Sequence, residues 1–202
     1  LTRSIRDLGL DHLERLPGTR REAERIADLD PGSFVALDFF AGREILSHPA
    51  VRRARLLHLA THSLMNPRNP ALSGIVLSLV DEQGRPQQGF LRADEIAELG
   101  LSADLVVLSA CKTALGPEVR GEGLLSLARA FFEGGASRVV VSLWAVEDNA
   151  SADLMTRFYD GLLRQGLPAA AALRQAQLAT RDAAEKNGRS EWAAFELQGD
   201  WR

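Results

Sequence analysis

The sequence contains a single cysteine, Cys111, among its 202 residues. One cysteine cannot form an internal disulfide, which agrees with a reducing compartment. A lone cysteine is either a small buried apolar side chain or a reactive thiol, and burial is the commoner case. What surrounds Cys111 in the sequence therefore decides how it is interpreted.

Other features are also scarce. No run approaches the roughly 18 uncharged apolar residues that a bilayer-spanning helix needs, and the N-terminus lacks the apolar core of a secretory signal. The net charge of −3 gives no reason to expect nucleic acid or an anionic membrane as a partner. We therefore predict a cytoplasmic protein that binds neither nucleic acid nor membrane.

Histidine is scarce too, which bears on metal binding. The chain has four histidines, and His58 and His62 are four residues apart. That spacing suits a metal site only on a helix, whereas this segment resembles a strand, and no Glu follows His58 as a metalloprotease motif requires. Phosphate-loop, dinucleotide and G-x-S-x-G motifs are absent as well. We predict no metal and no cofactor.

The residues that are present predict one α/β domain over residues 1–202. The chain is 46% apolar and 25% charged, as is usual for a folded protein. Three apolar runs, "RLLHLATHS", "DLVVLSAC" and "SRVVVSLWAV", are typical of buried strands. Helical patterns alternate with them, so we expect a mostly parallel sheet with helices on both faces.

Finer predictions concern individual segments. "GIVLSLVDEQGRPQQGFLR" is typical of a hairpin, "SFVALDF" and "WAAFEL" of short strands, and "KTALGPEVRGEG" of a polar loop. "TRREAERIADL" predicts a helix, with Thr19 as its cap and Glu22 completing a capping box.

His62, Cys111 and Asp148 are predicted to follow or end three of the buried strands. Chemistry in parallel sheets sits at the carboxyl ends of the strands. His62 lies 49 residues before Cys111, which parallels the spacing of a caspase histidine and cysteine. This pattern makes a catalytic Cys–His site a serious alternative to the interpretation of Cys111 as a buried apolar residue.

Five blocks carry a family resemblance: "LLHLATHS", "ADLVVLSACKTALG", "GEGLLSLARAFFEGGASRVVVSLWAVEDNASADLMTRFYDGLL", "ALRQAQLA" and "WAAFELQGD". In order and spacing they resemble the CHAT domain, a caspase-like cysteine peptidase family related to separase and often attached to tetratricopeptide repeats. The resemblance runs from Leu16 to Asp200. It implies a caspase–hemoglobinase fold, a three-layer sandwich. It also implies that the family's most N-terminal strand and helix are lacking here and that the chain is part of a longer protein.

The resemblance also implies roles for individual residues. His62 becomes the base and Cys111 the nucleophile, with the backbone N–H groups of Cys111 and Ser63 holding the oxyanion. Asp148 matches the acidic residue that pairs with a substrate Arg or Lys in the S1 pocket. Glu147 and Trp144 are further candidates for that pocket. The alternative for Asp148 is a first-turn helix acid, with the pocket role favoured, whereas Trp144 is as often an ordinary core aromatic.

The predicted function is peptide-bond hydrolysis after Arg or Lys in a specific protein substrate. A role in bacterial defence or programmed cell death follows from the family only. Two alternatives stay open at this point: a caspase-like signalling or scaffold module without turnover, and an acyltransferase or other thiol hydrolase that uses the same pair of residues.

Overall fold

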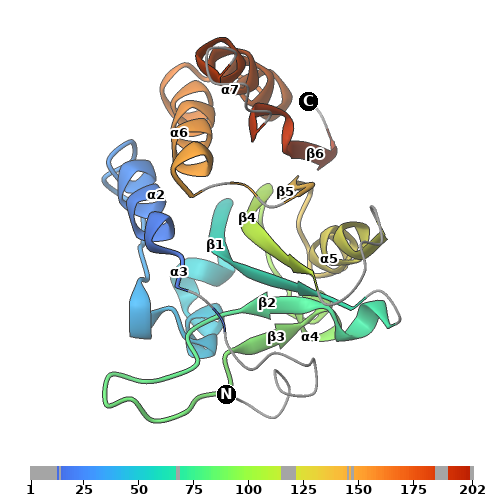
Figure 1. Ribbon diagram of the computed structural model, residues 1–202. Coiled ribbons are helices and arrows are strands. Elements are labelled where there is room, and N and C mark those ends of the chain that lie inside the picture. Colours follow the sequence, from blue (N-terminus) through green and yellow to red (C-terminus); the bar gives the residue numbers. More distant parts are fainter. Residues whose placement is uncertain are drawn as a thin grey trace.

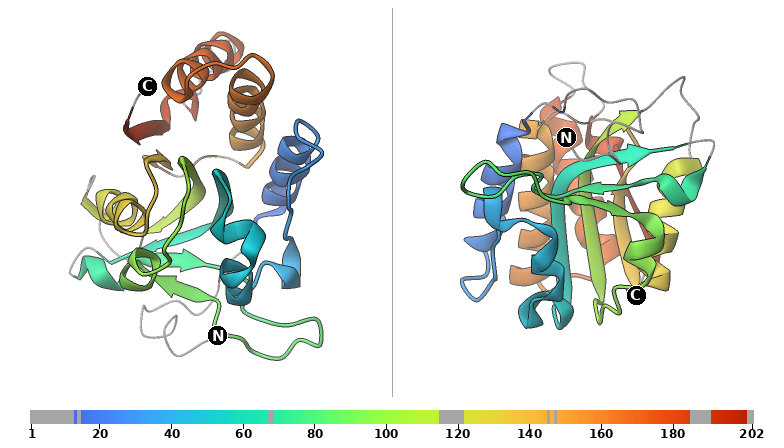
Figure 2. Two further views of the ribbon diagram at one scale, coloured as in Figure 1. Left: turned by 180° about the vertical axis from the view of Figure 1, so that it is seen from behind. Right: turned by 90° about the horizontal axis from the view of Figure 1, so that it is seen from below.

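The computed structural model describes residues 13, 15–66, 69–114, 122–144, 146, 148–184 and 191–200; within these ranges, the side chains at 110–114, 122–125, 148 and 183–184 are not described. The chain forms a six-stranded sheet with helices packed on both faces (Figures 1 and 2).

The sheet has the strand order β3-β2-β1-β4-β5-β6. Its strands are β1 (Leu56–Met65), β2 (Gly74–Val76), β3 (Phe90–Arg92), β4 (Leu105–Ala114), β5 (Arg138–Ser142) and β6 (Phe195–Gly199). The central strands β1, β4 and β5 are parallel, while β2, β3 and β6 join by antiparallel pairs at the two sides. The β1–β4 ladder, in which all ten residues of each strand are paired, therefore forms the centre of the sheet.

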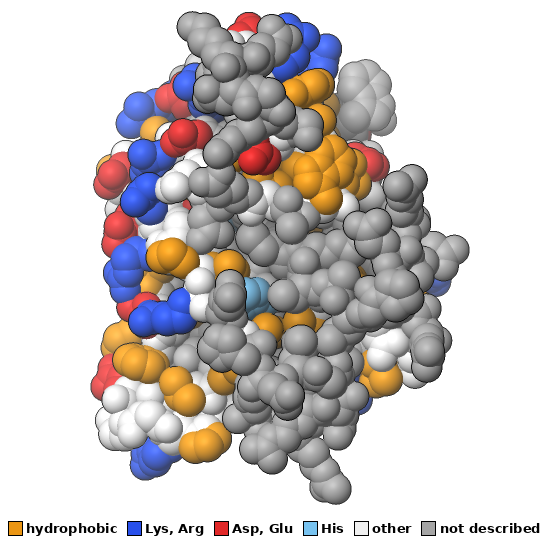
Figure 3. All heavy atoms as spheres, viewed as in Figure 1, with side chains coloured by type: hydrophobic (Ala, Val, Ile, Leu, Met, Phe, Trp, Pro, Cys, Tyr) orange, Lys and Arg blue, Asp and Glu red, His pale blue; other side chains and the backbone are white. Residues whose placement is uncertain are grey.

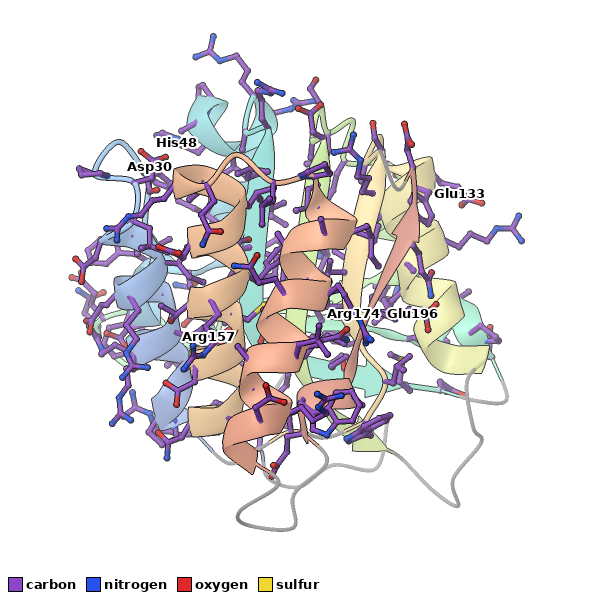
Figure 4. All side chains as sticks on the ribbon, turned by 90° about the horizontal axis from the view of Figure 1, so that it is seen from above. Asp30, His48, Glu133, Arg157, Arg174 and Glu196 are labelled. Atoms are coloured by element: carbon purple, nitrogen blue, oxygen red, sulfur yellow. The ribbon has the colours of Figure 1, made fainter. Side chains whose placement is uncertain are left out.

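Helices α2 (Pro17–Ala27), α6 (Asp148–Tyr159) and α7 (Ala169–Ala184) cover one face, and a π-helical turn at Asp160–Arg164 continues α6. Figure 4 looks onto this helical layer, with Arg157 on α6 and Arg174 on α7. Val107 and Val140 of the sheet pack here against Phe158. We call this side of the sheet the α6 face.

The opposite side, the α5 face, is covered by α3 (Pro49–Arg52), α4 (Ala93–Ala97) and α5 (Glu122–Glu133). Because strand side chains alternate, Val106 and Leu108 of β4 point here, and Phe131 of α5 is fully buried against them. Short 3-10 turns occur at Asp38–Phe40, Arg43–Ser47, Pro70–Leu72 and Glu191–Ala193.

These observations confirm the predicted α/β architecture with helices on both faces. The predicted hairpin is also present as β2 and β3. The first three residues of the predicted polar loop belong instead to β4, and residues 115–121 of that loop lie outside the described residues.

Two local predictions are wrong. The segment 33–37 forms no strand, and Asp38, with a φ of 50°, begins a 3-10 helix directly after the extended Leu37. The helix α2 begins at Pro17, whose fixed φ suits a first turn, so Thr19 lies inside the helix and does not cap it. Glu22 is therefore free of a capping role, and it points inward.

Candidate active site

His62 and Cys111 are direct neighbours across two parallel strands. In the β1–β4 ladder, the Cα partner of His62 is Cys111. Adjacent strands lie about 4.8 Å apart, and residues in register belong to the same face of a sheet. His62 and Cys111, which are 49 positions apart in the sequence, therefore lie only one strand spacing apart in the sheet.

Both strands continue three residues beyond this pair, to Met65 and Ala114. The sequence placed the strand ends at His62 and Cys111. On β1 the extension is explained by burial, because Leu64 and Met65 pack into the core and β2 pairs with His62, Ser63 and Leu64. The pair therefore lies inside the ladder, near its carboxyl end.

The amino end of α6 lies beside this part of β4. Ser109, two residues before Cys111, has its Oγ 2.8 Å from the Oγ of Ser151, which lies one turn into α6. Asp148 is the first residue of α6. Since three residues make roughly one helical turn, the start of α6 lies close to the segment of β4 that contains Cys111.

A buried polar network centred on Glu22 contacts the same part of the sheet and the start of α6. Glu22 of α2 is only 2% exposed, yet it is a charged residue. Its Oε2 accepts a 3.2 Å hydrogen bond from the Oγ of Ser151, and its Oε1 lies 2.9 Å from the Nε2 of His58. The second contact has an ion-pair distance, although the two groups are not aligned as a hydrogen bond. The carboxylate of Glu22 on α2 thus contacts β1 through His58 and α6 through Ser151, and Ser151 in turn contacts β4 through Ser109.

Tyr159 completes the network from the end of α6. Its hydroxyl lies 3.2 Å from the Nδ1 of His58, and the two rings meet edge to face. Burial raises the pKa of Tyr159 well above its ordinary value, and the nearby negative charge of Glu22 raises that pKa further. The phenol therefore stays protonated in the folded protein at all ordinary pH values.

The remaining predicted site residues differ in how they are placed. Ser63 is fully buried in β1, with Lys112 of β4 and Ile75 of β2 as its neighbours in register. Trp144, just after β5, is 38% exposed, which does not fit an ordinary core aromatic. The side chains of Cys111 and Asp148, and all of Glu147, lie outside the described part of the chain.

Sequence reasoning missed Glu22, Ser109, Ser151 and Tyr159 and assigned His58 only a structural role. Glu22 stands in a charged helical stretch, where a carboxylate is usually solvated. The one available signal was that His58 and His62 share strand parity, so both belong to the α6 face.

Neither a metal site nor a membrane span emerges from the described residues. Among them, no group of three or more His, Cys, Asp or Glu side chains could hold a metal ion. None of the helices in these ranges is long and apolar enough to cross a membrane.

A six-stranded α/β sandwich with histidine and cysteine in register on adjacent parallel strands defines a caspase-like class of protein. The family model of the CHAT domain matches residues 7–200, so the chain belongs to the CHAT domain family. CHAT domains are related to cysteine peptidases.

Two curated relatives match the chain in part. Tetratricopeptide repeat protein 28 of Mus musculus is 40% identical over 109 residues, which is 54% of this chain and 4% of that protein. Tetratricopeptide repeat protein 28 of Homo sapiens is 37% identical over 113 residues, covering 56% of this chain and 4% of that protein. The similarity therefore concerns only a small part of each relative.

Proposed function

We propose that this chain is a cysteine endopeptidase domain in which His62 and Cys111 form the catalytic pair. The observation that carries the proposal is the register of the β1–β4 ladder, in which His62 and Cys111 are Cα partners. In a chain with one cysteine and four histidines, this pairing brings together the two residue types that thiol catalysis requires.

The chemistry follows from the residue types. His62 takes the proton of the Cys111 thiol, and the thiolate attacks the scissile carbonyl carbon. The tetrahedral intermediate collapses to an acyl-enzyme as the amine leaves with a proton from His62, and water then hydrolyses the thioester. The amino end of α6 beside this part of β4 supplies the positive end of a helix dipole, which favours a thiolate.

The oxyanion would be held by the backbone N–H groups of Cys111 and Ser63. For this role the backbone N–H of Ser63 must be accessible to the substrate, but Ser63 lies between β4 on one side and β2 on the other. A backbone N–H that serves the sheet cannot also serve the substrate. Opening of the ladder beyond His62 is therefore part of the proposed catalytic cycle.

The substrate would be a protein cut after Arg or Lys, with Asp148 pairing with the basic side chain. Support comes from the position of Asp148 at the start of α6, one turn from the contact between Ser151 and Ser109. Trp144, half-exposed after β5, would wall the same S1 pocket, and Glu147 would add a second carboxylate. The names of the two relatives support a tetratricopeptide-repeat module as a partner in the same polypeptide.

The single cysteine makes a direct test possible. Intact-mass measurement after treatment with peptidyl acyloxymethyl ketones reports only on Cys111. We expect a P1 Arg probe to label the chain faster than a P1 Leu probe. His62→Ala should slow labelling by about 10²–10⁴-fold, and Asp148→Ala should remove the preference for Arg while labelling persists.

His48→Asn is the matched control, because His48 is an exposed histidine that caps α3 and Asn preserves the cap. Its labelling should equal that of the parent. If His62→Ala labels as fast as His48→Asn, the catalytic pair is refuted and the chain is better described as a caspase-like signalling module. Transfer of the acyl group to an amine, seen in product analysis, would instead indicate an acyltransferase. A role in bacterial defence or programmed death stays a prediction from the family.

A further inference from the structure

The candidate residues of the site are held in place by two different means. His62 and Cys111 belong to the β1–β4 ladder, whose main-chain pairing sets their separation whatever their side chains are. Asp148, which is proposed to bind a basic substrate side chain, is instead the first residue of a helix. Its position relative to Cys111 must therefore come from the contacts that α6 makes with its neighbours.

The main-chain pairing between β4 and β5 stops short of the site. Among the described residues, this ladder pairs Val106–Leu108 with Val139–Val141 and ends one residue before Ser109. The chain then leaves β5 at Ser142 and enters α6 at Asp148, six residues later. Side chains that join α6 to the neighbouring elements thus decide where the helix begins.

A buried contact between two serines joins α6 to β4. Ser109 and Ser151 are both buried, and their Oγ atoms lie 2.8 Å apart. Ser151 is three residues after Asp148, about 4.5 Å along the helix axis, and Ser109 is two residues before Cys111, about 6.6 Å along the strand. Because a hydrogen bond between hydroxyls permits distances of only about 2.5–3.0 Å, it fixes this separation more closely than apolar packing does.

The hydrogen bonds run in one direction, towards Glu22. The Oγ of Ser151 donates to the Oε2 of Glu22 over 3.2 Å, and a hydroxyl has a single proton to donate. Ser109 is therefore the donor to Ser151. The other carboxylate oxygen of Glu22, Oε1, lies 2.9 Å from the Nε2 of His58 on β1. The start of α6 is thus joined to β4 directly and to β1 through Glu22, and these are the two strands that carry the candidate pair.

The other polar contacts between α2 and the first turns of α6 are exposed. The Nη1 of Arg21 lies 2.5 Å from the Oδ1 of Asn149, and Arg25 forms an ion pair with Asp153. Charged side chains of both signs are mixed along this side of the molecule, at the left of Figure 3. Such exposed contacts constrain position weakly, because water and salt screen them and the side chains are long. The buried hydroxyls and the carboxylate therefore provide the main constraint.

Stability alone does not require polar groups at this place. Leu105 and Val107, the preceding residues of β4 on the same face, pack with Leu154 and Met155 of α6 in an apolar core. Burying polar and charged groups is costly, and a well-packed apolar replacement is often at least as stable. Polar side chains follow these apolar ones at the part of β4 nearest Cys111, where exact position is worth more than additional burial.

We propose that Ser109, Ser151 and Glu22 are positioning residues for substrate selectivity, which hold Asp148 at the distance from Cys111 that a P1 Arg or Lys side chain requires. This inference rests on the proposed S1 role of Asp148. All three residues are buried and act through the first turn of α6. Loss of either hydroxyl lets this turn shift, so the basic side chain loses its partner while the catalytic pair stays in register.

The test compares labelling of Cys111 by P1 Arg and P1 Leu acyloxymethyl ketones, followed by intact mass. Ser151→Ala should lower the ratio of the Arg rate to the Leu rate about tenfold, through weaker binding of the Arg probe. The Leu rate should stay within about twofold of the parent rate, because the β1–β4 ladder is intact. Ser109→Ala and the double variant should lower the ratio by the same factor, since each change breaks the same chain of hydrogen bonds.

Two controls accompany these variants. Thr156→Val removes a hydroxyl from the same helix, but that hydroxyl donates to the carbonyl of Ala152 within α6, so the ratio should equal that of the parent. Ser109→Thr keeps a hydroxyl at the strand position and should also retain the ratio. Glu22 is less suited to this test, because its removal also affects His58 on β1.

The inference is overturned if Ser151→Ala keeps the parent ratio, or if it slows both probes equally, as a general loss of stability would do. If the ratio survives in Ser151→Ala but is abolished in Asp148→Ala, the S1 role stands and only the positioning is wrong. A parent chain without preference for the Arg probe overturns the inference together with the S1 role. The catalytic pair is judged separately, by the effect of His62→Ala on the Leu rate.

Discussion

The two faces of the sheet are built by different means. On the α5 face, the core is built from apolar side chains such as Phe131, Leu108 and Ile96, and a buried polar side chain that belongs to this face by register, Ser63, carries no charge. The α6 face also has an apolar core, but Glu22 is buried within it, with His58 and Tyr159 alongside. Glu22 is the only charged residue that is fully buried in the described part of the chain.

The difference matters because the two kinds of contact constrain position differently. Apolar contacts tolerate small shifts if volume is preserved, whereas a buried carboxylate keeps its low energy only while every partner stays within reach. The network ties α2, β1, β4 and α6 together on the face to which His62 and Cys111 belong by register. Both faces have apolar cores that stabilise the fold, and we infer that the network of the α6 face also aligns the strands that carry the candidate pair.

The largest effect is expected on the apolar face. Phe131→Ala removes a fully buried ring from α5 and should lower the free energy of unfolding by about 3–5 kcal/mol. Phe131 packs within an apolar cluster, so the loss should be equal at mildly acidic and mildly alkaline pH. Urea unfolding at the two pH values measures it. Arg129→Ala, an exposed change on the same helix, should cost little.

A somewhat smaller loss is expected when the buried charge is removed. Glu22→Ala leaves His58 and Ser151 without their shared partner and should cost about 3 kcal/mol. Glu24→Ala is the matched control on the same helix, because Glu24 forms only an exposed ion pair with Arg20 and should cost about 0.5 kcal/mol or less.

The energetic coupling between Glu22 and His58 distinguishes a network that aligns the strands from one that is merely buried. In a double-mutant cycle, Glu22→Ala and His58→Ala should be non-additive by about 1–3 kcal/mol. The Glu22→Ala chain, refolded under stabilising conditions, should also alkylate at Cys111 more slowly than the Glu24→Ala chain. Additive losses and equal alkylation rates would mean that the network is ordinary packing and that the contrast between the faces has no functional content.

Much of the fold was predictable because each central strand is a short apolar run bounded by polar residues. "LLHLATHS" and "DLVVLSAC" predicted β1 and β4, and the alternation with helices predicted layers on both faces. The proximity of His62 and Cys111 followed from one rule, that parallel strands align their carboxyl ends. The family resemblance assigned their chemistry.

The parts that failed depend on contacts between distant segments. Glu22 in "TRREAERIADL" resembles a cap or a solvated acid, and only the packing of α2 against β1 and α6 brings it to His58 and Ser151. "SFVALDF" has the composition of a strand, but the positive φ of Asp38 turns the chain into a 3-10 helix, and no strand in the described part of the chain pairs with this segment. Local propensity does not contain either fact.

The smallest effect concerns Tyr159, the outermost member of the network, whose ionisation can be followed by ultraviolet absorbance. Tyr159 is the only tyrosine of the chain. Burial, and then the charge of Glu22, raise its pKa in the folded state above the ordinary value of about 10. A raised folded pKa gives a stabilisation that is complete below the unfolded pKa and is lost as pH rises beyond it, because only the unfolded chain can ionise. We therefore expect tyrosinate absorbance to appear only together with the loss of tertiary structure in alkaline titration.

Tyr159→Phe keeps the ring and removes the hydroxyl that contacts His58, so it should cost about 1 kcal/mol at neutral pH. The same variant should unfold less steeply with alkali, because the group that ionises on unfolding is gone. Glu22→Gln offers the complementary change, since it removes the negative charge that contributes to the raised pKa while the burial stays. A tyrosine that titrates near its ordinary pKa in the folded parent chain would show that the α6 face is open to solvent, and the two faces would then differ in composition but not in the way they hold the strands.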